Sequence, residues 1–95
     1  MPAEVEAAMS EHPSVVDVAV IGLPDDDLGQ RAHAVVVVAD PMNAPTLDEL
    51  LAHARSLLAP YKVPRGIEFV DALPRSDMFK IRRSALVAER TPHAS

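Results

Sequence analysis

One lysine in the C-terminal part of the chain stands where its side chain could meet an anion. Lys80 ends the polar loop of the segment LPRSDMFKIRR, residues 73–83, and a short amphipathic run follows it. The lysine ammonium is a compact charge that can bind a phosphate or a carboxylate as a point donor. From this segment alone two interpretations stay open: a lysine placed to meet an anion, or a solvated helix start.

The distribution of charge favours an anionic ligand for this part of the chain. The 95 residues carry 14 acidic and 9 basic side chains, which gives a net charge of −5. Residues 1–60 hold ten acidic and two basic side chains, whereas residues 61–95 hold four acidic and seven basic ones. The balance is therefore −8 in the first part and +3 in the second, so the total charge hides a basic segment.

Composition argues against several classes of function. The only aromatic residues are Tyr61, Phe69 and Phe79, so no base-stacking platform is available, and the net charge is negative. Both features argue against nucleic-acid binding. The absence of cysteine excludes disulfides, thiolate metal sites and a cysteine nucleophile, and it fits a cytoplasmic protein. The longest apolar run, residues 34–39, is too short for a transmembrane segment.

No other segment carries a recognisable catalytic or metal-binding pattern. The segment GLPDDDLGQR, residues 22–31, is rich in glycine, proline and aspartate, which predicts a loop. Its aspartates lack the distant glutamate of a calcium-binding loop, so they predict a solvated turn and no metal site. The same segment lacks the lysine–serine ending of a phosphate-binding P-loop. We therefore expect this chain alone to bind neither a metal ion nor ATP.

Apolar periodicity and turn residues predict the elements that must position Lys80. Residues 32–39 are apolar on both faces, which predicts a central strand. Thr46 is the predicted N-cap of the longest helix, because Glu49 follows it at the spacing of a capping box. The predicted elements are a helix over 3–11, strands over 15–21 and 32–39, a helix over 46–58, a strand over 66–70, and a last helix marked by Ile81, Ala85 and Ala88.

This order of elements predicts an α+β fold, α-β-β-α-β-α, with a small, largely antiparallel sheet of three strands packed with helices. The first two strands are joined by the loop of residues 22–31 and are expected to be antiparallel. The long helix is expected to pack on the sheet through its leucine stripe. The sequence shows no domain boundary, so residues 1–95 are expected to form a single domain.

Four segments together resemble the C-terminal domain of the adenylate-forming enzymes. That superfamily includes acyl- and aryl-CoA synthetases, peptide-synthetase adenylation domains and luciferases, and the likeness is greatest to acyl-CoA synthetases. The match runs from Pro2 to about Leu86 and rests on all the segments in their order and spacing. The segments are PAEVEAAMSEHPSV, VAVIGLPDDDLGQRAHAVVV, LAPYKVP and IEFVDALPRSDMFKIRRSAL.

The resemblance implies that the chain is the mobile C-terminal domain of an acid–CoA ligase. Such enzymes join a carboxylic acid to ATP, used with Mg²⁺, as an acyl-adenylate and then transfer the acyl group to CoA. The implied partners are the acid, ATP, CoA and a large N-terminal domain that binds ATP and the acid and is absent here. The chain alone is therefore expected to be inactive, and the intact enzyme is expected in the cytoplasm.

The family also implies a catalytic role for Lys80. In family members, a loop lysine of the small domain reaches the carboxylate of the acid and the α-phosphate of ATP. Residues 74–78 match the family's loop pattern, and Lys80 takes the position of that lysine. Phe79 stands where glycine is usual, and a phenylalanine adopts a positive φ only at a cost. This departure implies either a variant loop path or a different acid pocket.

Two further residues carry weaker implications. Gly29 matches a structural loop glycine of the family. Arg55 falls where some CoA-forming members place a basic residue against the nucleotide part of CoA, although a solvent-facing arginine is the alternative. Two other functions stay open for the chain as a whole: a stand-alone interaction or regulatory module, and the adenylation domain of a peptide synthetase.

Overall fold

The computed structural model describes residues 2–27 and 29–91. Within these residues the elements follow the predicted order, α-β-β-α-β-α, and the predicted α+β class is confirmed. The α-helices are α1 (Pro2–Ser10), α2 (Leu47–Leu57) and α3 (Arg83–Arg90); the strands are β1 (Val15–Asp25), β2 (Gly29–Val38) and β3 (Gly66–Phe69); and two 3-10 turns are η1 (Pro41–Asn43) and η2 (Pro60–Lys62). None of these helices is long and apolar enough to cross a membrane.

The sheet has the strand order β1-β2-β3, so the predicted central position of β2 is confirmed. Its residues Ala34, Val35 and Val36 are fully buried, as a strand covered on both faces must be. Strands β1 and β2 are antiparallel, as predicted, whereas β3 runs parallel to β2 and makes the sheet mixed. The parallel pair needs a crossover connection, and α2 lies within it.

The predicted loop over residues 22–31 is wrong at both of its ends, which are strands, and only the turn after Asp25 agrees with it. Strand β1 continues to Asp25 and β2 begins at Gly29, and the two strands stay paired up to those residues. The local composition suggested a loop. In the long hairpin, however, the backbone N–H and C=O groups of these residues form cross-strand hydrogen bonds, which a loop would not provide. Pro24 is tolerated because β1 lies at the edge of the sheet, where one side of the strand needs no partner.

A bulge in β1 turns Asp17 toward the α3 side of the sheet. The register shifts between Val15 and Asp17, and the intervening Val16 is 61% exposed. Beyond the bulge, alternate residues face opposite sides of the sheet. Ala19 and Ile21 belong to the apolar cluster under α3, so Asp17 begins the series that faces the same helix.

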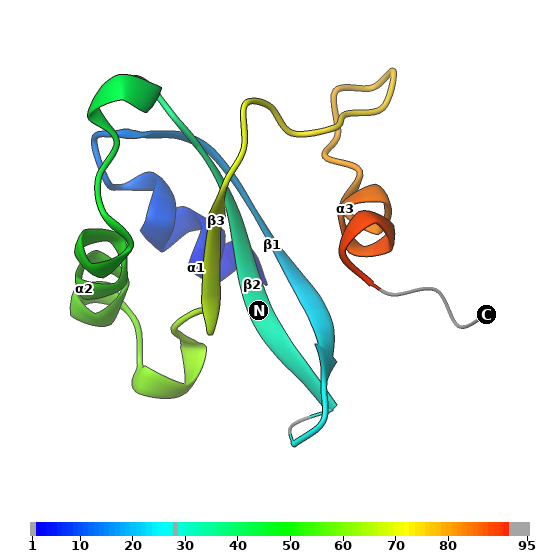
Figure 1. Ribbon diagram of the computed structural model, residues 1–95, viewed down its shortest axis with the longest axis horizontal. Helices are drawn as coiled ribbons and strands as arrows, with labels where there is room; N and C mark the ends of the chain where they lie inside the picture. Colours follow the sequence, from blue (N-terminus) through cyan, green and yellow to red (C-terminus); the bar gives the residue numbers. More distant parts are fainter. Residues whose placement is uncertain (1, 28, 92–95) are drawn as a thin grey trace.

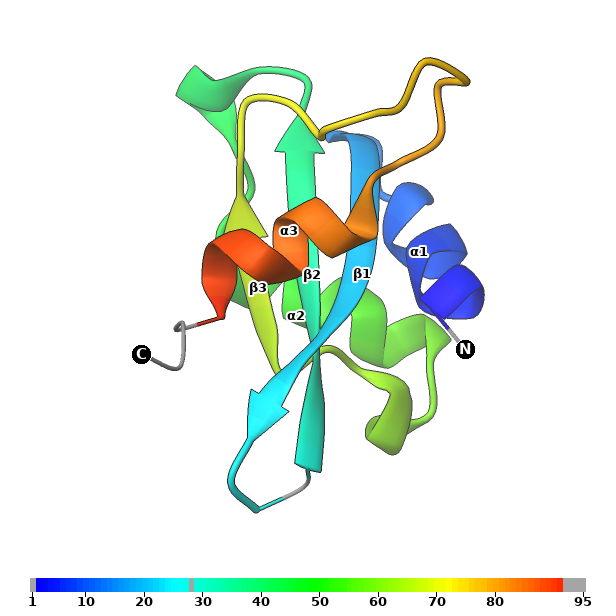
Figure 2. The same cartoon turned by 90° about the vertical axis from the view of Figure 1, so that its right-hand side faces the viewer.

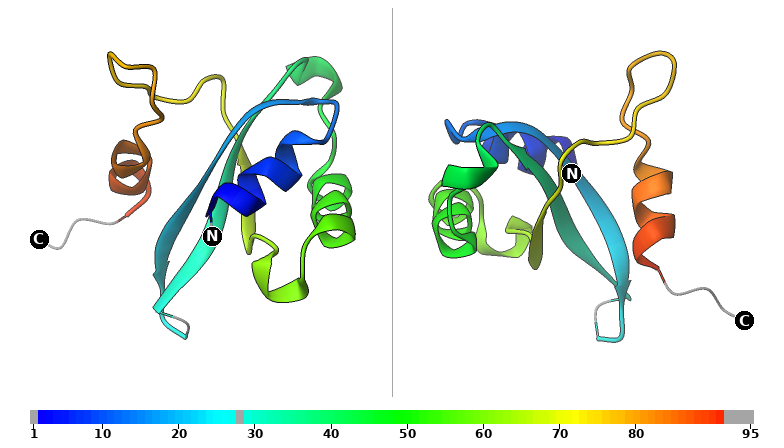
Figure 3. Two further views of the ribbon diagram at one scale, coloured as in Figure 1. Left: turned by 180° about the vertical axis from the view of Figure 1, so that it is seen from behind. Right: turned by 45° about the horizontal axis from the view of Figure 1, so that its top comes forward.

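Helices cover both faces of the sheet and create two apolar clusters. In Figure 1, α1 and α2 lie on one face and α3 on the other; Figure 2 shows α3 crossing the strands, and the left view of Figure 3 shows α1 on the opposite side. The larger cluster joins α1, α2 and the sheet, with Met9 and Leu50 fully buried. The smaller cluster lies under α3, around Val35, Leu73 and Leu86.

The capping and burial of α2 and α3 follow their local sequences. The Thr46 hydroxyl accepts the Glu49 N–H at 3.1 Å, which confirms the predicted N-cap of α2. The prediction that Ile81, Ala85 and Ala88 mark α3 is partly wrong. Ile81 precedes the helix and forms an antiparallel backbone bridge with Arg75, and Ala88 is exposed. Leu86 is the residue that α3 buries, because the helix begins two residues later than Ile81 and a different stripe faces the sheet.

Candidate active-site loop and basic cavity

Lys80 follows the tip of a tight hairpin formed by residues 74–82. The Ser76 N–H donates to the Lys80 carbonyl at 2.8 Å, and the Phe79 N–H donates to the Ser76 carbonyl at 2.9 Å. The Arg82 N–H donates to the Pro74 carbonyl at 2.8 Å and closes the base of the hairpin. Three-residue hairpin loops of this kind need a left-handed residue at the end of the turn.

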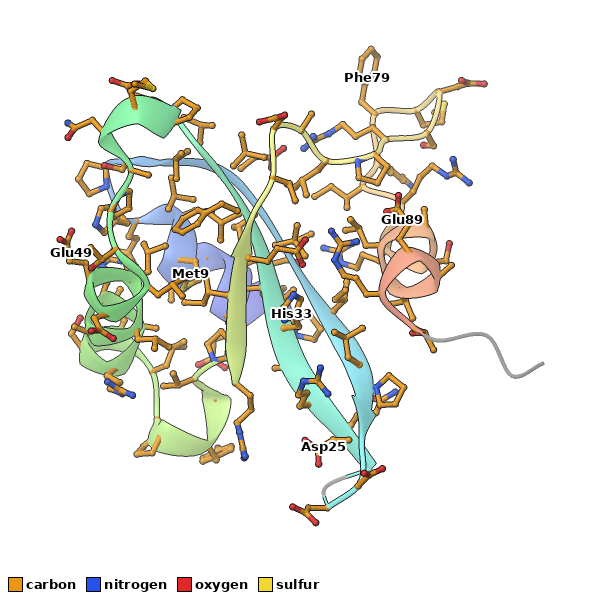
Figure 4. All side chains as sticks on the ribbon, viewed as in Figure 1. Met9, Asp25, His33, Glu49, Phe79 and Glu89 are labelled. Carbon is orange, nitrogen blue, oxygen red and sulfur yellow. The ribbon has the colours of Figure 1, made fainter. Side chains whose placement is uncertain are left out.

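Phe79 is that left-handed residue. Its φ is 62°, and it is the only non-glycine residue with a positive φ in the described part of the chain. A side chain in this conformation costs about 1–2 kcal/mol, which gives a physical reason for the glycine that the resemblance to adenylate-forming enzymes implies at this position. Phe79 is 83% exposed, and its aromatic ring points away from the body of the domain (Figure 4). The loop therefore keeps a left-handed turn and bears the strain of a phenylalanine.

The Lys80 ammonium is free to meet a ligand. Lys80 is exposed, and its side chain makes no ion pair or hydrogen bond with any residue that the structure describes. Four other basic side chains are neutralised by carboxylates: Lys62 by Glu4, Arg75 by Asp17, Arg83 by Glu6, and Arg90 by Glu68. The side chain of Arg82, two residues after Lys80, is likewise unpaired. The hairpin therefore presents uncompensated positive charge at its C-terminal end.

Both ends of the hairpin are tied to the rest of the domain. At the first end, Arg75 pairs with Asp17 on β1 at 2.6 Å. At the second end, Arg83 binds both carboxylate oxygens of Glu6 on α1, at 2.7 and 2.8 Å. Glu6 also accepts the Val20 N–H at 2.8 Å, which fixes its carboxylate against β1. The right view of Figure 3 shows the hairpin standing out from the rest of the domain. The Arg75–Asp17 and Arg83–Glu6 ion pairs fasten its two ends.

A third ion pair fastens the far end of α3 to the sheet. Arg90 binds the Glu68 carboxylate through Nε and Nη2, both at 2.7 Å, and His33 Nε2 lies 2.8 Å from the same carboxylate. These contacts, led by the Arg90 hydrogen bonds, lower the pKa of Glu68 to about 2 although partial burial opposes the shift. His33 projects from the sheet toward α3 in Figure 4.

Arg55 lies on a different face from the hairpin, at the mouth of a cavity of about 470 Å³. The cavity sits between the end of α2, η2 and the start of β3, and Arg65 lies at its edge together with Arg55. Both side chains are exposed, and neither has a charged or hydrogen-bonded partner among residues 2–27 and 29–91. The rest of the lining is apolar: Leu51, Leu58, Pro60, Val63 and Pro64. Two free guanidinium groups beside an apolar floor suit a ligand with phosphates and a flat apolar part.

The structure thus distributes the predicted residues over three places. Lys80 and Phe79 share the hairpin, whereas Arg55 lies beyond α2 and Gly29 lies at the tip of the β1–β2 hairpin. Gly29 has a φ of 78°, which gives its position a conformational reason for glycine. Sequence reasoning missed Arg65, although it stands in the segment YKVPRG next to Arg55's helix. It also missed Asp17, since no local pattern links that residue to Arg75.

The described residues do not offer a metal site. No group of three or more histidine, aspartate or glutamate side chains gathers within them in a way that could hold an ion. Asp25 and Asp27 lie at the end of the β1–β2 hairpin, where the Asp27 N–H donates to Asp25 Oδ1 at 2.8 Å. This contact is the local side-chain bond of an Asx-type turn, which agrees with the turn expected for the aspartates.

Together, the mixed three-stranded sheet and the hairpin define a small α+β domain that carries an exposed lysine without a partner among its described residues. Residues 4–80 match the family of the AMP-binding enzyme C-terminal domain, and the chain belongs to that family. It is 51% identical over 75 residues to the 3-oxocholest-4-en-26-oate–CoA ligase of Rhodococcus rhodochrous, a match that covers 79% of this chain and 13% of that enzyme. It is 47% identical over 87 residues to a probable 2-succinylbenzoate–CoA ligase of Mycobacterium tuberculosis, covering 92% of this chain and 23% of the relative.

Solved structures agree with the sequence relatives. A fatty acyl CoA synthetase of Mycobacterium tuberculosis superposes with a TM-score of 0.88 at 35% identity, over 96% of this chain and 18% of that one. The amide bond synthetase McbA of Marinactinospora thermotolerans also gives a TM-score of 0.88, at 36% identity, over 96% of this chain and 18% of that one. The chain thus spans less than a quarter of the relatives named here.

Proposed function

We propose that residues 1–95 are the C-terminal domain of an acid–CoA ligase. In the first step, the carboxylate of an acid attacks the α-phosphate of ATP, which forms an acyl-adenylate and releases pyrophosphate. In the second step, the thiol of CoA attacks the acyl carbon and AMP leaves. The observation that carries the proposal is the unpaired Lys80 ammonium on its anchored hairpin, together with the membership of the family.

Lys80 is the catalytic residue that we assign to the first step. The carboxylate and the phosphate are both anions, so they repel each other as they approach. A cation between them offsets that repulsion and stabilises the charge that develops in the transition state. A lysine already neutralised by a carboxylate could not serve, and Lys80 has no such partner in the part of the chain that the structure describes.

The remaining machinery belongs to an N-terminal domain in this proposal. That domain binds ATP and the acid, and Mg²⁺ accompanies the phosphates of ATP there. The donor set of this chain does not fit the metal, since its described carboxylates and histidines form no group that could hold one. The isolated chain is accordingly inactive and binds neither substrate tightly. A cytoplasmic location, where ATP and CoA are both available, is part of the same proposal.

The cavity beside Arg55 supports CoA as the acyl acceptor. CoA carries several phosphates and an adenine ring, which suit two free arginines beside an apolar floor. We therefore assign Arg55, with Arg65 beside it, to the nucleotide part of CoA. The amide bond synthetase among the structural relatives suggests a second candidate, an amine acceptor, because its name describes amide formation on the same fold.

The test uses the full-length ligase, meaning the polypeptide in which this domain is joined to its N-terminal domain. We expect pyrophosphate release that depends on ATP and a carboxylic acid, and thioester formation that depends on CoA. A panel of fatty, aromatic and steroid-side-chain acids should identify the acid. The proposal is wrong if no acid supports pyrophosphate release. An acyl transfer that prefers amines to CoA would favour the second candidate.

A further inference from the structure

One side chain holds both the base and the tip of the hairpin that carries Lys80. The Arg75 guanidinium donates from Nη1 to Asp17 Oδ2 at 2.6 Å and from Nη2 to Asp17 Oδ1 at 3.2 Å. Its remaining nitrogen, Nε, donates to the carbonyl of Phe79 at 3.2 Å. A planar guanidinium can make these bonds together, whereas a lysine ammonium at the same place could not reproduce the fork.

The Phe79 carbonyl is the atom through which this contact reaches Lys80. It belongs to the peptide group between the two residues, so its direction sets where the Lys80 backbone begins. Phe79 is also the strained, left-handed residue of the turn, with φ 62°. A strained residue persists only when its surroundings fix it, and the Arg75 hydrogen bond fixes it from outside the turn.

Asp17 is also held in place by contacts other than the one with Arg75. The bulge in β1 puts Asp17 on the α3 side of the sheet, in register with Val37 of the central strand. The Val18 N–H donates to Asp17 Oδ1 at 3.1 Å, which orients the carboxylate. The Asp17 side chain is 26% exposed, so it is partly screened from water. The chain of contacts therefore runs from a rigid strand to the loop tip: Asp17, Arg75, the Phe79 carbonyl, Lys80.

We propose that Asp17 is a positioning residue for Lys80 in the adenylation step, acting through Arg75 and the Phe79 carbonyl. The inference rests on the proposed function, because it needs Lys80 to be catalytic. Asp17 touches neither substrate, and its effect is to keep the hairpin in one geometry. When the domain closes against its partner domain, the lysine then arrives already aimed. A displacement of about 1 Å at such a group can cost up to about a hundredfold in rate.

The main variant is Asp17→Asn in the full-length ligase, with the two half-reactions measured separately. We expect kcat for adenylate formation to fall about tenfold, within the range that small misplacements produce, with unchanged KM values for ATP and the acid. Thioester formation from supplied acyl-adenylate and CoA should keep its rate, because Lys80 has no role in that step. Asp17→Glu, which keeps the carboxylate, should restore part of the loss.

Hydrogen exchange measured by mass spectrometry gives a second readout that does not depend on activity. The amides of Ser76, Phe79 and Arg82 are hydrogen-bonded within the hairpin, so a peptide covering residues 73–83 should be protected. Asp17→Asn should accelerate exchange in this peptide and leave the peptides of α1 and α2 unchanged. Arg75→Lys should do the same, and Asp17→Asn combined with Arg75→Lys should add little to either change.

The matched control is Glu4→Gln, which removes another carboxylate–cation pair, at 2.7 Å to Lys62, far along the chain from the hairpin. It should change neither half-reaction. The inference is overturned if Asp17→Asn leaves adenylate formation within twofold, or slows both half-reactions alike. Lys80→Ala, run beside it, separates the two proposals. If Lys80→Ala slows adenylation and Asp17→Asn does not, only the positioning role fails; if Lys80→Ala changes nothing, the proposed function fails and the positioning role fails with it.

Discussion

The segments that cover the two faces of the sheet are attached to it by different kinds of contact. On one face, α1 and α2 pack through the larger apolar cluster, which includes Met9, Leu50 and Ala54, and the basic cavity lies beyond it. On the other face, α3 and the hairpin cover a smaller cluster and are fastened by three arginines that pair with carboxylates. The cavity side is therefore held mainly by non-directional packing, to which the Lys62–Glu4 ion pair and the contact of His53 with the Ala8 carbonyl are added, whereas directional contacts have a larger share on the side of the lysine.

This difference suits what each face is proposed to do. A cavity that receives a flexible ligand needs only a stable wall. Apolar burial supplies such a wall without fixing the direction of individual side chains. A lysine that must meet a reacting pair of anions needs a fixed direction, and bidentate arginine–carboxylate contacts supply it. Exposed ion pairs add little stability, so their use on the hairpin side indicates geometry as their main contribution.

The strongest test of the comparison removes the cation itself. Lys80→Ala in the full-length ligase should slow adenylate formation by about 10²–10³, because one well-aimed charge at a developing anion is worth about 3–4 kcal/mol. Single-turnover pyrophosphate release measures this step. The thioester step, started from supplied acyl-adenylate and CoA, should stay within twofold. Equal slowing of both steps, or of neither, would contradict the division of work between the two faces.

The reciprocal test acts on the cavity. Arg55→Ala should raise the KM for CoA by about 10- to 100-fold and leave adenylate formation unchanged, since a hydrogen bond to a charged group is worth about 1.5–3 kcal/mol. Arg65→Ala should act in the same direction. Arg31→Ala is the control, because it removes an arginine that lies outside this cavity and binds the Pro24 carbonyl. If pyrophosphate release suffers as much as CoA use, Arg55 does not serve CoA.

The fold could be predicted further than the site, and the reason is sequence distance. Thr46 and Glu49 predict the start of α2, because a capping box is a local pattern. The apolar run of β2 predicts its central position in the sheet. Local composition failed at residues 22–31, where strand pairing overrode glycine and aspartate. The hairpin's anchors could not be predicted, because Arg75 and Asp17 are 58 residues apart and Arg83 and Glu6 are 77 apart.

A third prediction concerns the ion pair at the end of α3. The pKa of Glu68 is about 2 in the folded chain against 4.5 ordinarily, so its stabilising effect is present above pH 4.5 and is lost as pH falls toward 2. Partial exposure screens the pair, so Glu68→Gln should lower the free energy of unfolding by about 1 kcal/mol at pH 7. Wild type and variant should converge near pH 2.

Urea unfolding of the isolated chain, which should be cooperative, measures this effect through its backbone circular dichroism. Glu89→Gln is the matched control, since Glu89 also approaches Arg90 but at 3.4 Å and with 67% of its side chain exposed. It should change stability by less than about 0.5 kcal/mol. A Glu68 variant that is as stable as the wild type at pH 7 would show that the Arg90–Glu68 ion pair does not help to hold α3, which would then depend on the apolar cluster and the Arg83–Glu6 ion pair.

The smallest expected effect is at the loop tip. Phe79→Gly should relieve about 1–2 kcal/mol of left-handed strain and lose about 0.5–1 kcal/mol to the greater freedom of glycine in the unfolded chain. The net gain should therefore be about 0–1.5 kcal/mol, seen as a higher urea midpoint. Met78→Gly, at the exposed neighbour without a positive φ, should give no gain. Loss of stability in both variants would show that the turn is not strained.

The aromatic composition has an optical consequence. The chain has no tryptophan and one tyrosine, Tyr61, whose ring is 83% exposed and 5.6 Å from the Lys62 ammonium. The only strong ultraviolet chromophore therefore lies on the surface, and its emission and near-ultraviolet dichroism will change little when the aliphatic core melts. Tyr61 does, however, line a second cavity, of about 380 Å³, which lies against α1 and the β1–β2 pair and not beside Arg55. The fluorescence of this ring should therefore report on a ligand bound in that second cavity and respond little to unfolding.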